Sequence, residues 1–533
     1  MIGTQVTALF SFFYLRRYRH PYENDCISFT TSAISLVVVL ITSALLPVDI
    51  FLVSFMKTTD GNWAEWADSN ETRLLVEDSM QYSYYALYTI VFVFLFMIIP
   101  FVYFFFEEKD DDVFGSPRSR FCSALKFTLI FMVIAFAMLM IGAFAPLKLP
   151  PASENATEWD RIEFLFNNLK NNRGEDAIAM VLSILSIIGM VNLIFYTGFG
   201  MFSWPMGLIR GLKSARDQSE EIQEQHLVNQ TRINALKDKQ RIGGRLSSRE
   251  MKQLTKLERS ERNINRQEEL VEEVRGSLWY KCRRFMRPIE VAIGCVLGLL
   301  AFLIWMSLLL TNIDKAMNGK GARMGYVLEK RTLPNPIDVI LVFLQKIFPL
   351  DYLLLFLITW FLILCTISGI RNLGIRILFV KMYRLKRRRT RPQALLLTCV
   401  TLMLTVLAIN ILMYCVSPQY VTFGSQQFVS QTSVNGTIVD KVMACDLNRV
   451  NMNNTIGDCV MTRNSALLTR FFYKAWFFGA AYYWCSWAFI AVSGLALVYV
   501  ILRKTKAVTD DLDDDDDEEL EDDDPSRTRN NRR

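Results

Sequence analysis

Residues 26–56 read CISFTTSAISLVVVLITSALLPVDIFLVSFM, and this stretch decides the fold class. Its only charged side chain is that of Asp49. An α-helix needs about 20 mostly apolar residues to cross a bilayer core of roughly 30 Å. Because lipid offers the backbone no hydrogen-bond partners, only helices and closed barrels can span it. The stretch therefore predicts a transmembrane α-helix.

Further apolar stretches of similar character follow along the chain, at residues 84–106, 125–147, 177–201, 289–310, 352–370, 394–416 and 471–502. Residues 1–15 are also apolar but short, and they predict a shortened first helix. A signal peptide is the alternative, although no basic region precedes the stretch and no small-residue cleavage site follows it. The sequence thus predicts an all-α polytopic membrane protein of about nine transmembrane helices, with helices 1–5 in residues 1–202 and helices 6–9 in residues 288–503.

Two independent patterns predict the orientation of these helices. Basic clusters occur at residues 16–19, 281–287, 381–391 and 503–506, and short basic loops stay in the cytosol. The loops on the other side carry the glycosylation sequons Asn70, Asn155, Asn435 and Asn453, which are used only in the secretory lumen. The patterns agree on a lumenal N-terminus and a cytosolic C-terminus. The sequon at Asn229 falls in a basic loop and is expected to stay unused.

Cys445 and Cys459 lie in the last expected lumenal loop, close to two sequons. The secretory lumen is oxidising and permits disulfides. A bridge between the two residues is predicted, with two free thiols as the alternative. Most of the other cysteines lie in or beside apolar stretches, where cysteine behaves as a small hydrophobic residue.

Residues 203–287 form the largest polar segment, which predicts a cytosolic, highly charged helical hairpin. From residue 251 onwards apolar residues recur mostly at helical spacing, and Gly243-Gly244 marks a turn before them. The stripe is expected to pack either on the other arm, residues 215–240, or on a second protein. The net positive loop could also contact anionic lipid headgroups, and no nucleic-acid partner is expected.

Residues 504–533 predict an acidic, disordered cytosolic tail. The run 510–524 reads DDLDDDDDEELEDDD, and such a block repels itself. It is either a solvated tail or a docking or sorting signal.

No pattern of catalytic residues is found. The whole chain has two histidines, His20 and His226, which excludes an HExxH zinc helix and a multi-histidine metal site. The sequence also lacks the glycine-rich signatures of P-loop and dinucleotide-binding proteins. We therefore expect no enzymatic activity, no catalytic or metal-binding residues and no covalently bound cofactor.

Two charged residues lie in or beside the apolar stretches, where burying a charge in lipid costs about 2.5–3.5 kcal/mol or more. Asp49 follows Pro47 in the second stretch, and Arg371 follows the stretch 352–370. Each is either an interfacial residue that reaches the headgroups or part of an intramembrane polar cavity.

Several motifs along almost the whole chain resemble the limb-region membrane protein family. They are ITSALLPVDIFLVS (41–54), PFVYFFFEEKDDD (100–112), TEWDRIEFLF (157–166), GIRNLGIR (369–376), RTRPQALL (389–396), PQYVTFGSQ (418–426) and WFFGAAYYWCSWAF (476–489).

The resemblance implies nine spans, a lysosomal membrane location reached through the endoplasmic reticulum, and a role in exporting cobalamin (vitamin B12) to the cytosol. It implies an escort or adaptor that acts through an ABC transporter of subfamily D, with a cytosolic cobalamin-processing protein as a further partner and cobalamin as the transported ligand. A clathrin adaptor is another partner that the family implies. The alternatives are a direct transporter of cobalamin or another solute, and a membrane receptor or endocytic adaptor. Pairing of the chain with itself stays open.

Overall fold

The computed structural model divides into two compact units, of which unit 1 comprises residues 1–203 and 299–498 and unit 2 comprises residues 204–298 and 499–533. The structure describes residues 2–19, 26–58, 60–111, 117–144, 173–211, 215–242, 250–251, 253–258, 260–262, 264–265, 268, 278–319, 321–322, 326, 331–345, 347–377, 380–383, 385, 390–434, 437–445, 459–474 and 476–502. Almost all regular structure within these ranges is helical.

Eight helices are long and apolar enough to cross a membrane among the described residues, and they confirm the eight longer stretches expected from the sequence. They are α2 (Cys26–Phe55), α3 (Asn70–Val93) continued by η2 (Phe94–Ile98) and α4 (Ile99–Asp111), α5 (Pro117–Phe144), α7 (Arg173–Asn192) continued by η3 (Leu193–Thr197) and α8 (Gly198–Arg210), α11 (Leu278–Asn318), α13 (Leu350–Leu373), α14 (Pro392–Val416) and α18 (Trp476–Leu502).

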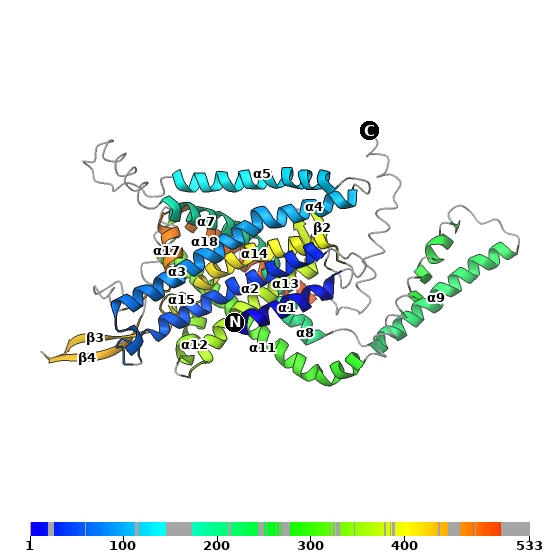
Figure 1. Cartoon of the computed structure of the whole chain (residues 1–533). Helices are drawn as coiled ribbons and strands as arrows, with labels where there is room; N and C mark the ends of the chain where they lie inside the picture. The colour runs from blue at the N-terminus through cyan, green and yellow to red at the C-terminus, as the bar shows by residue number, and fades with distance from the viewer. Residues whose placement is uncertain are drawn as a thin grey trace. The chain divides into compact units, whose positions relative to one another are not determined.

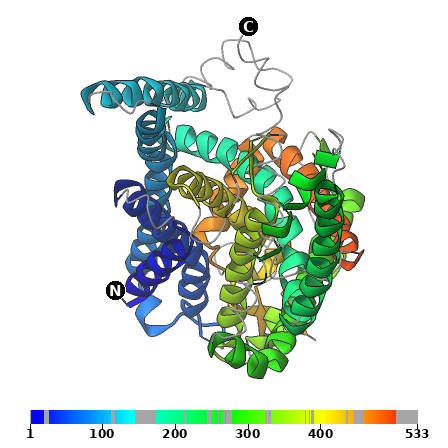
Figure 2. The same cartoon turned by 90° about the vertical axis from the view of Figure 1, so that its right-hand side faces the viewer.

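The expected short first helix is α1 (Ile2–Tyr18), which packs along α2. Its 17 residues extend over about 25 Å at 1.5 Å per residue, less than the thickness of a bilayer core. Figure 2 shows α1, in dark blue, at the edge of the bundle. The eight helices that meet the length of a span therefore do not include α1.

Helix α14 is the most enclosed of the eight. In its most apolar window, 83% of the residues are buried, compared with 17% in α5. Helices α2, α7 and α13 contact α14, whereas α5 lies against α4 and α7 (Figure 1). The exposed side chains of α5 include Leu129, Val133 and Phe136. The core of unit 1 thus lies around α14, and α5 offers its apolar surface to lipid or to another membrane helix.

Two glycines allow α13 to approach η3 and α8 closely. A Cβ atom on Gly200 would lie 1.8 Å from the carbonyl oxygen of Cys365, and one on Gly369 would lie 1.9 Å from that of Tyr196. Between these positions the hydroxyls of Thr197 and Thr366 are 2.8 Å apart and hydrogen-bonded. Small residues and interhelical hydrogen bonds of this kind hold membrane helices together, because lipid provides little hydrophobic driving force.

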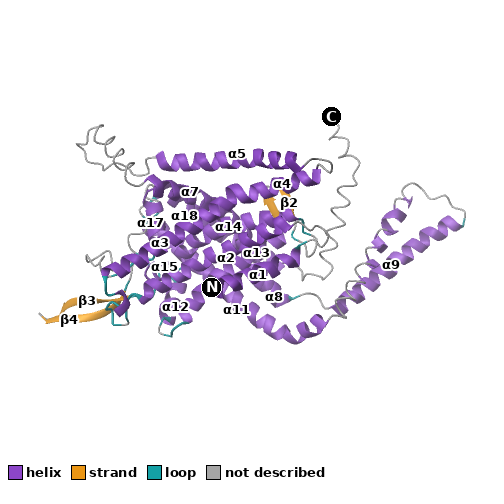
Figure 3. Cartoon of the chain, viewed as in Figure 1, coloured by secondary structure: helices purple, strands orange, loops and turns teal. Residues whose placement is uncertain are grey.

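Two antiparallel hairpins, which the sequence analysis did not predict, add to the helices (Figure 3). One pairs β1 (Ile375–Ile377) with β2 (Val380–Tyr383), and the other pairs β3 (Gln427–Val434) with β4 (Thr437–Ala444). In the second hairpin Val434 pairs with Thr437 across an Asn-Gly dipeptide, which is the strongest short-range hairpin signal. The fold is therefore nearly all-α, with a strand pair at each end of unit 1.

Three short helices complete the end of unit 1 that holds β3 and β4 (Figure 1). They are α12 (Pro336–Leu344), α15 (Pro418–Phe423) and α17 (Arg463–Lys474). We call this end of unit 1 the α15 end. The hairpin of β1 and β2 lies at the opposite end.

Unit 2 contains the polar segment expected to form a hairpin. Helix α9 (Ala215–Arg241) forms one arm, and helical residues between 250 and 268 form the other. Lys237 pairs with Glu258 at 3.0 Å, and the Asn229 amide donates to the hydroxyl of Ser260 at 3.0 Å. The apolar residues between the arms are buried; they are Ile222, Ile233, Leu254 and Ile264. The described stripe residues Leu254 and Ile264 thus pack on the other arm, which is one of the two alternatives expected from the sequence. The turn at Gly243-Gly244 and the acidic tail lie outside the described residues.

Candidate functional site

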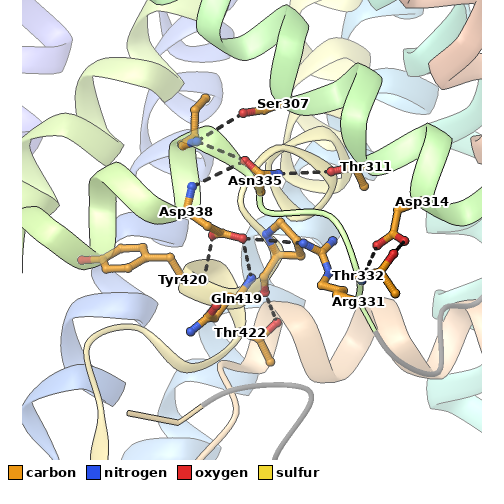
Figure 4. A network of polar contacts seen from close by, with 12 residues as sticks. Ser307, Thr311, Asp314, Arg331, Thr332, Asn335, Asp338, Gln419, Tyr420 and Thr422 are labelled. Atoms are coloured by element: carbon orange, nitrogen blue, oxygen red, sulfur yellow. Dashed lines mark hydrogen bonds and ion pairs between the residues drawn. The ribbon is translucent and has the colours of Figure 1, made fainter.

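Helix α15 is held in place by a carboxylate from another part of the chain. Its first residue is Pro418, and the hydroxyl of the preceding Ser417 makes no capping hydrogen bond. Instead, the buried carboxylate of Asp338 in α12 accepts hydrogen bonds from the backbone N–H groups of Gln419, at 3.3 Å, and Tyr420, at 3.2 Å (Figure 4). A helix leaves its first N–H groups without partners inside the helix, and a negative charge at that position is favourable. Asp338 therefore positions α15.

The charge of Asp338 is balanced by Arg331. One guanidinium nitrogen of Arg331 lies 3.7 Å from the Asp338 carboxylate, and both side chains are largely shielded from solvent. A buried carboxylate without such a partner would be unfavourable, because removing a charge from water costs several kcal/mol. The ion pair and the two backbone hydrogen bonds together satisfy this carboxylate.

Helix α12, which carries Asp338, is itself fixed to α11. Asn335 precedes the helix, and its side-chain oxygen accepts from the backbone N–H groups of Ile337 and Asp338 at 3.1 and 3.5 Å. The amide nitrogen of Asn335 donates to the hydroxyl of Thr311 in α11 at 3.1 Å. The hydroxyl of Ser307, also in α11, accepts from the Ile337 N–H at 3.3 Å. Figure 4 shows these side chains pointing toward one another.

A second acidic residue of α11 fixes the segment that leads into α12. The carboxylate of Asp314 accepts from the Thr332 hydroxyl at 2.6 Å, from the Thr332 N–H at 3.2 Å and from the Asn318 amide at 2.7 Å. Thr332 follows Arg331 directly, so this contact also positions the guanidinium that pairs with Asp338. We refer to Asp314, Arg331, Asn335 and Asp338, with their partners in Figure 4, as the polar network.

Tyr420 extends the contacts of α15 to the start of α13. Its hydroxyl donates to the carboxylate of Asp351 at 2.8 Å. Burial, and then the charge of Asp351, raise the pKa of Tyr420 well above its ordinary value. The phenol therefore keeps its proton and remains a hydrogen-bond donor at any physiological pH.

Asp49, one of the two charged residues singled out in the sequence, has a comparable role at the same end. It is fully buried, and its carboxylate accepts from the Tyr84 hydroxyl at 3.2 Å and from the backbone N–H of Asn464 at 3.0 Å. Asn464 is the second residue of α17, so Asp49 caps that helix. The neighbouring Arg463 forms an ion pair with Glu77 in α3. Helices α2, α3 and α17 are joined through these contacts.

Arg371, the other charged residue, lies elsewhere. It is exposed in the last turn of α13, whereas Asp351 is in the first turn of the same helix. About 20 helical residues separate these turns, which corresponds to roughly 30 Å. The structure therefore does not bring Asp49 and Arg371 into one cavity. The interfacial interpretation fits the exposed position of Arg371, and Asp49 belongs to a buried polar cluster.

Cys445 and Cys459 form a disulfide, with their Cα atoms 6.2 Å apart. Both pack with Phe423 at the end of α15 and Phe428 in β3. Beside them the side-chain nitrogen of Gln426 donates to the carbonyl oxygen of Val460 at 2.7 Å. The side-chain oxygen of Gln426 accepts from the Val460 N–H at 3.0 Å. The disulfide thus joins the end of β4 to the segment that leads into α17.

Replacing Cys459 by serine is expected to lower the stability of the α15 end by about 3 kcal/mol, because a bridge over some 15 residues restricts the unfolded chain by roughly that amount. Limited proteolysis of the purified protein should then cut between β4 and α17 more rapidly. Cys122→Ser, at an exposed free cysteine, is the matched control and should leave the pattern unchanged. Two free thiols at positions 445 and 459 in an unreduced digest would contradict the bridge.

The predicted glycosylation sites are only partly described. Asn70 is exposed at the first residue of α3, where Ser69 caps the helix by accepting from the Thr72 N–H. Asn155, Asn435 and Asn453 lie outside the described residues. Asn229 lies in α9 and contacts Ser260.

The sequence analysis did not identify Asp338, Arg331 or Asp351. A local signal for the first was present, since Asn335-Pro336 followed by Asp338 is typical of a helix start. No local pattern indicates that Asp338 caps a helix about 80 residues further along the chain. That contact depends on how α12 and α15 pack.

The carboxylates of the polar network are all occupied by backbone or side-chain donors of the same chain. Among the described residues, no group of three or more His, Cys, Asp and Glu side chains could hold a metal ion. The contacts of the polar network fix α12, which lies between α11 and α13 in the chain, to α15, which lies between α14 and α18.

Comparison with known proteins gives one family and several relatives. The family model of the LMBR1-like membrane proteins matches residues 1–287. A protein of Nematostella vectensis named "Probable lysosomal cobalamin transporter" is 41% identical, over 94% of this chain and 93% of its own length. The "Lysosomal cobalamin transport escort protein LMBD1" of Xenopus laevis is 39% identical, over 96% of this chain and 94% of its own length. The protein of the same name from Bos taurus is 38% identical, over 95% of this chain and 92% of its own length. No solved structure matches the chain.

Proposed function

Because this chain belongs to the LMBR1-like membrane protein family, we propose that it is a multi-pass protein of the lysosomal membrane that acts as an escort in the export of cobalamin. The observation that carries the proposal is the 38–39% identity, over almost the full length of both chains, to relatives named as escort proteins of lysosomal cobalamin transport. Cobalamin is the cargo in this proposal and not a resident cofactor.

The partner that we propose is an ABC transporter of subfamily D, which would supply the energy for export. This chain has no P-loop sequence, and an escort needs none, because the partner binds the ATP. A cytosolic cobalamin-processing protein is the further partner in the proposal. The escort itself would contribute a rigid set of helices, a charged hairpin in unit 2, and exposed apolar helix surfaces such as that of α5.

The orientation in the proposal places the α15 end in the lysosomal lumen. Two features support it: the sequons at Asn70, Asn435 and Asn453 belong to segments that begin or end there, and the disulfide lies among them. The polar network then holds the lumenal segments together in a compartment rich in hydrolases, since buried and hydrogen-bonded backbone is protected from proteolysis.

Glycan mapping is expected to find sugar on Asn70, Asn155, Asn435 and Asn453 and none on Asn229. The physical reason is that oligosaccharide is added only to chain on the lumenal side. Mass spectrometry after enzymatic deglycosylation in heavy-oxygen water marks each occupied site. Sugar on Asn229 together with four empty lumenal sequons would require the opposite orientation.

Removal of residues 218–276 is expected to weaken assembly with the transporter if the hairpin carries the docking surface. The variant should still reach the membrane, because the spans carry their own insertion signals, and an unchanged glycan map is the control for this. In cells that lack the native protein, we expect less transporter to co-purify with the variant and more cobalamin to stay in lysosomes. Undiminished co-purification would place the docking surface on the membrane helices.

A direct carrier is the second candidate, favoured by the name of the Nematostella vectensis relative. Reconstitution separates the two candidates. An escort alone in liposomes should not release trapped cobalamin, and release should need the ABC transporter and ATP. Release by the purified chain without any ATPase would establish the carrier and contradict the escort mechanism.

A further inference from the structure

The hairpin of unit 2 has an uneven distribution of charge along its length. Residues 232–262, which include the far end of α9, contain ten Lys and Arg against four Asp and Glu. The flanking residues 215–231 and 263–274 together contain two Lys and Arg against eight Asp and Glu. We call residues 232–262 the basic half of the hairpin. A local excess of one sign attracts a partner of the opposite sign.

The described part of the basic half offers exposed charge, with Ile242 and Met251 as its exposed large apolar side chains. Its inward-facing residues Ile233 and Leu254 are already buried between the arms. Two of its acidic residues, Glu250 and Glu258, are engaged by Lys239 and Lys237. Further basic side chains are exposed, at Arg232, Arg241, Lys256 and Arg262. The surface therefore suits an acidic segment.

Helix α18, which precedes the acidic tail in the chain, ends close to α8. The guanidinium of Arg210, at the end of α8, donates to the carbonyl oxygens of Val500 and Ile501 at 2.6 and 2.8 Å. Helix α11, which follows the hairpin, is fastened to the same turn of α8, because Arg287 donates to the carbonyl oxygens of Leu208 and Ile209 at 2.8 and 2.5 Å. The end of α18 thus lies beside the end of α8, the helix that precedes the hairpin in the chain.

The reach of the tail can be compared with the length of α9. Arg232 lies about 17 residues into α9, or about 26 Å along the helix, and Arg241 lies about 40 Å along it. The acidic run begins about 8 residues after Leu502, a segment that can extend over at most about 27 Å. The run ends about 22 residues after Leu502, which corresponds to at most about 75 Å. Residues 510–524 can therefore reach the whole basic half.

We propose that the acidic run 510–524 docks on the basic half of the hairpin within the same chain and shields it from other anionic surfaces. The run carries 13 acidic residues and no basic one. A short tether gives the tail an effective concentration in the millimolar range, which favours it over a free acidic partner. A phosphorylated or acidic partner of the hairpin must then displace the tail, so the contact is autoinhibitory.

Zero-length carbodiimide cross-linking of the purified full chain tests the proposal, since this reagent joins a lysine amine to a carboxylate only where the two touch. We expect cross-links from Lys239 or Lys256 to carboxylates of residues 510–524. The Lys237–Glu258 pair provides the internal standard. In about 1 M salt the Debye length falls to roughly 3 Å, and the tail cross-links should fall at least about fivefold relative to that standard.

A triple variant with Arg232→Gln, Arg241→Gln and Arg262→Gln keeps all the reporting lysines and should lower the same cross-links by a similar factor. The matched control carries Arg384→Gln, Arg387→Gln and Arg388→Gln in the other basic segment, residues 381–391. It should leave the yield of the tail cross-links unchanged. Tail cross-links to Lys381 or Lys386 instead would overturn the proposal. So would links between isotopically labelled and unlabelled copies, or the absence of tail cross-links altogether.

Discussion

Replacing Gly369 by valine is expected to prevent α13 from packing against η3 and to remove most of the folded protein. A Cβ atom at this position would lie 1.9 Å from the carbonyl oxygen of Tyr196 and 2.6 Å from its carbonyl carbon. Both neighbours are backbone atoms, so relief requires the two helices to separate. Separation also breaks the hydrogen bond between Thr197 and Thr366. We expect a loss of more than about 3 kcal/mol, at the upper end of overpacking effects.

Size-exclusion chromatography of a fluorescently tagged protein in detergent measures this loss as the height of the monodisperse peak. Gly207→Val is the matched control, because Gly207 is also a helical glycine but a Cβ atom there would have no neighbour within 4 Å. The control should stay close to wild type, apart from the small cost of a β-branched residue in a helix. Equal peaks for Gly369→Val and Gly207→Val would show that α13 and η3 do not pack this closely.

Replacing Asp338 by leucine is expected to destabilise the α15 end by about 3–5 kcal/mol. The change removes the acceptor of the Gln419 and Tyr420 N–H groups and leaves the Arg331 guanidinium without its carboxylate. Breaking a buried pair by removing one partner costs this much, mainly because the other charge is left uncompensated. The thermal unfolding midpoint in detergent should fall, and the protein should be degraded more rapidly in cells.

A second substitution separates the effect of losing the cap of α15 from the effect of leaving the Arg331 charge without its carboxylate. In the double variant Arg331→Leu and Asp338→Leu no charge is left unpaired, so part of the lost stability should return while the uncapped start of α15 remains. Asp68→Leu, at an exposed aspartate, is the control and should change the midpoint little. If Asp338→Leu behaved like Asp68→Leu, the Asp338 carboxylate would not be what holds α15.

The spans could be predicted from the sequence because each depends on its own composition. A run such as 26–56 is helical in lipid whatever its neighbours are, since its backbone groups must bond within the segment. The arms of the hairpin in unit 2 could be predicted for a related reason, because residues such as Leu254 and Ile264 follow the helical period. The hairpin of β3 and β4 also has a local signal, the Asn-Gly dipeptide at 435–436, but the same asparagine begins a sequon and so indicates a glycosylation site as well.

The buried polar clusters of the α15 end could be predicted only in part. Asp49 stood out because a carboxylate is rare in an apolar stretch, yet its partner Asn464 is 415 residues away in the sequence. Asp338 and Asp351 lie in segments where an acidic residue is unremarkable, so their burial gave no local signal. Their partners in α15 are 69 to 82 residues away.

The sequence by itself therefore determined that this protein spans a membrane, where its helices lie, and to which family it belongs, because hydropathy and motif similarity are properties of contiguous residues. Only the tertiary structure decided which carboxylate caps which helix, that Arg371 and Asp49 lie at separate ends, and that Gly200 and Gly369 bring α13 against η3 and α8. These features depend on the distances between segments that are remote in the chain. Such distances follow from how the side chains of all the helices pack together.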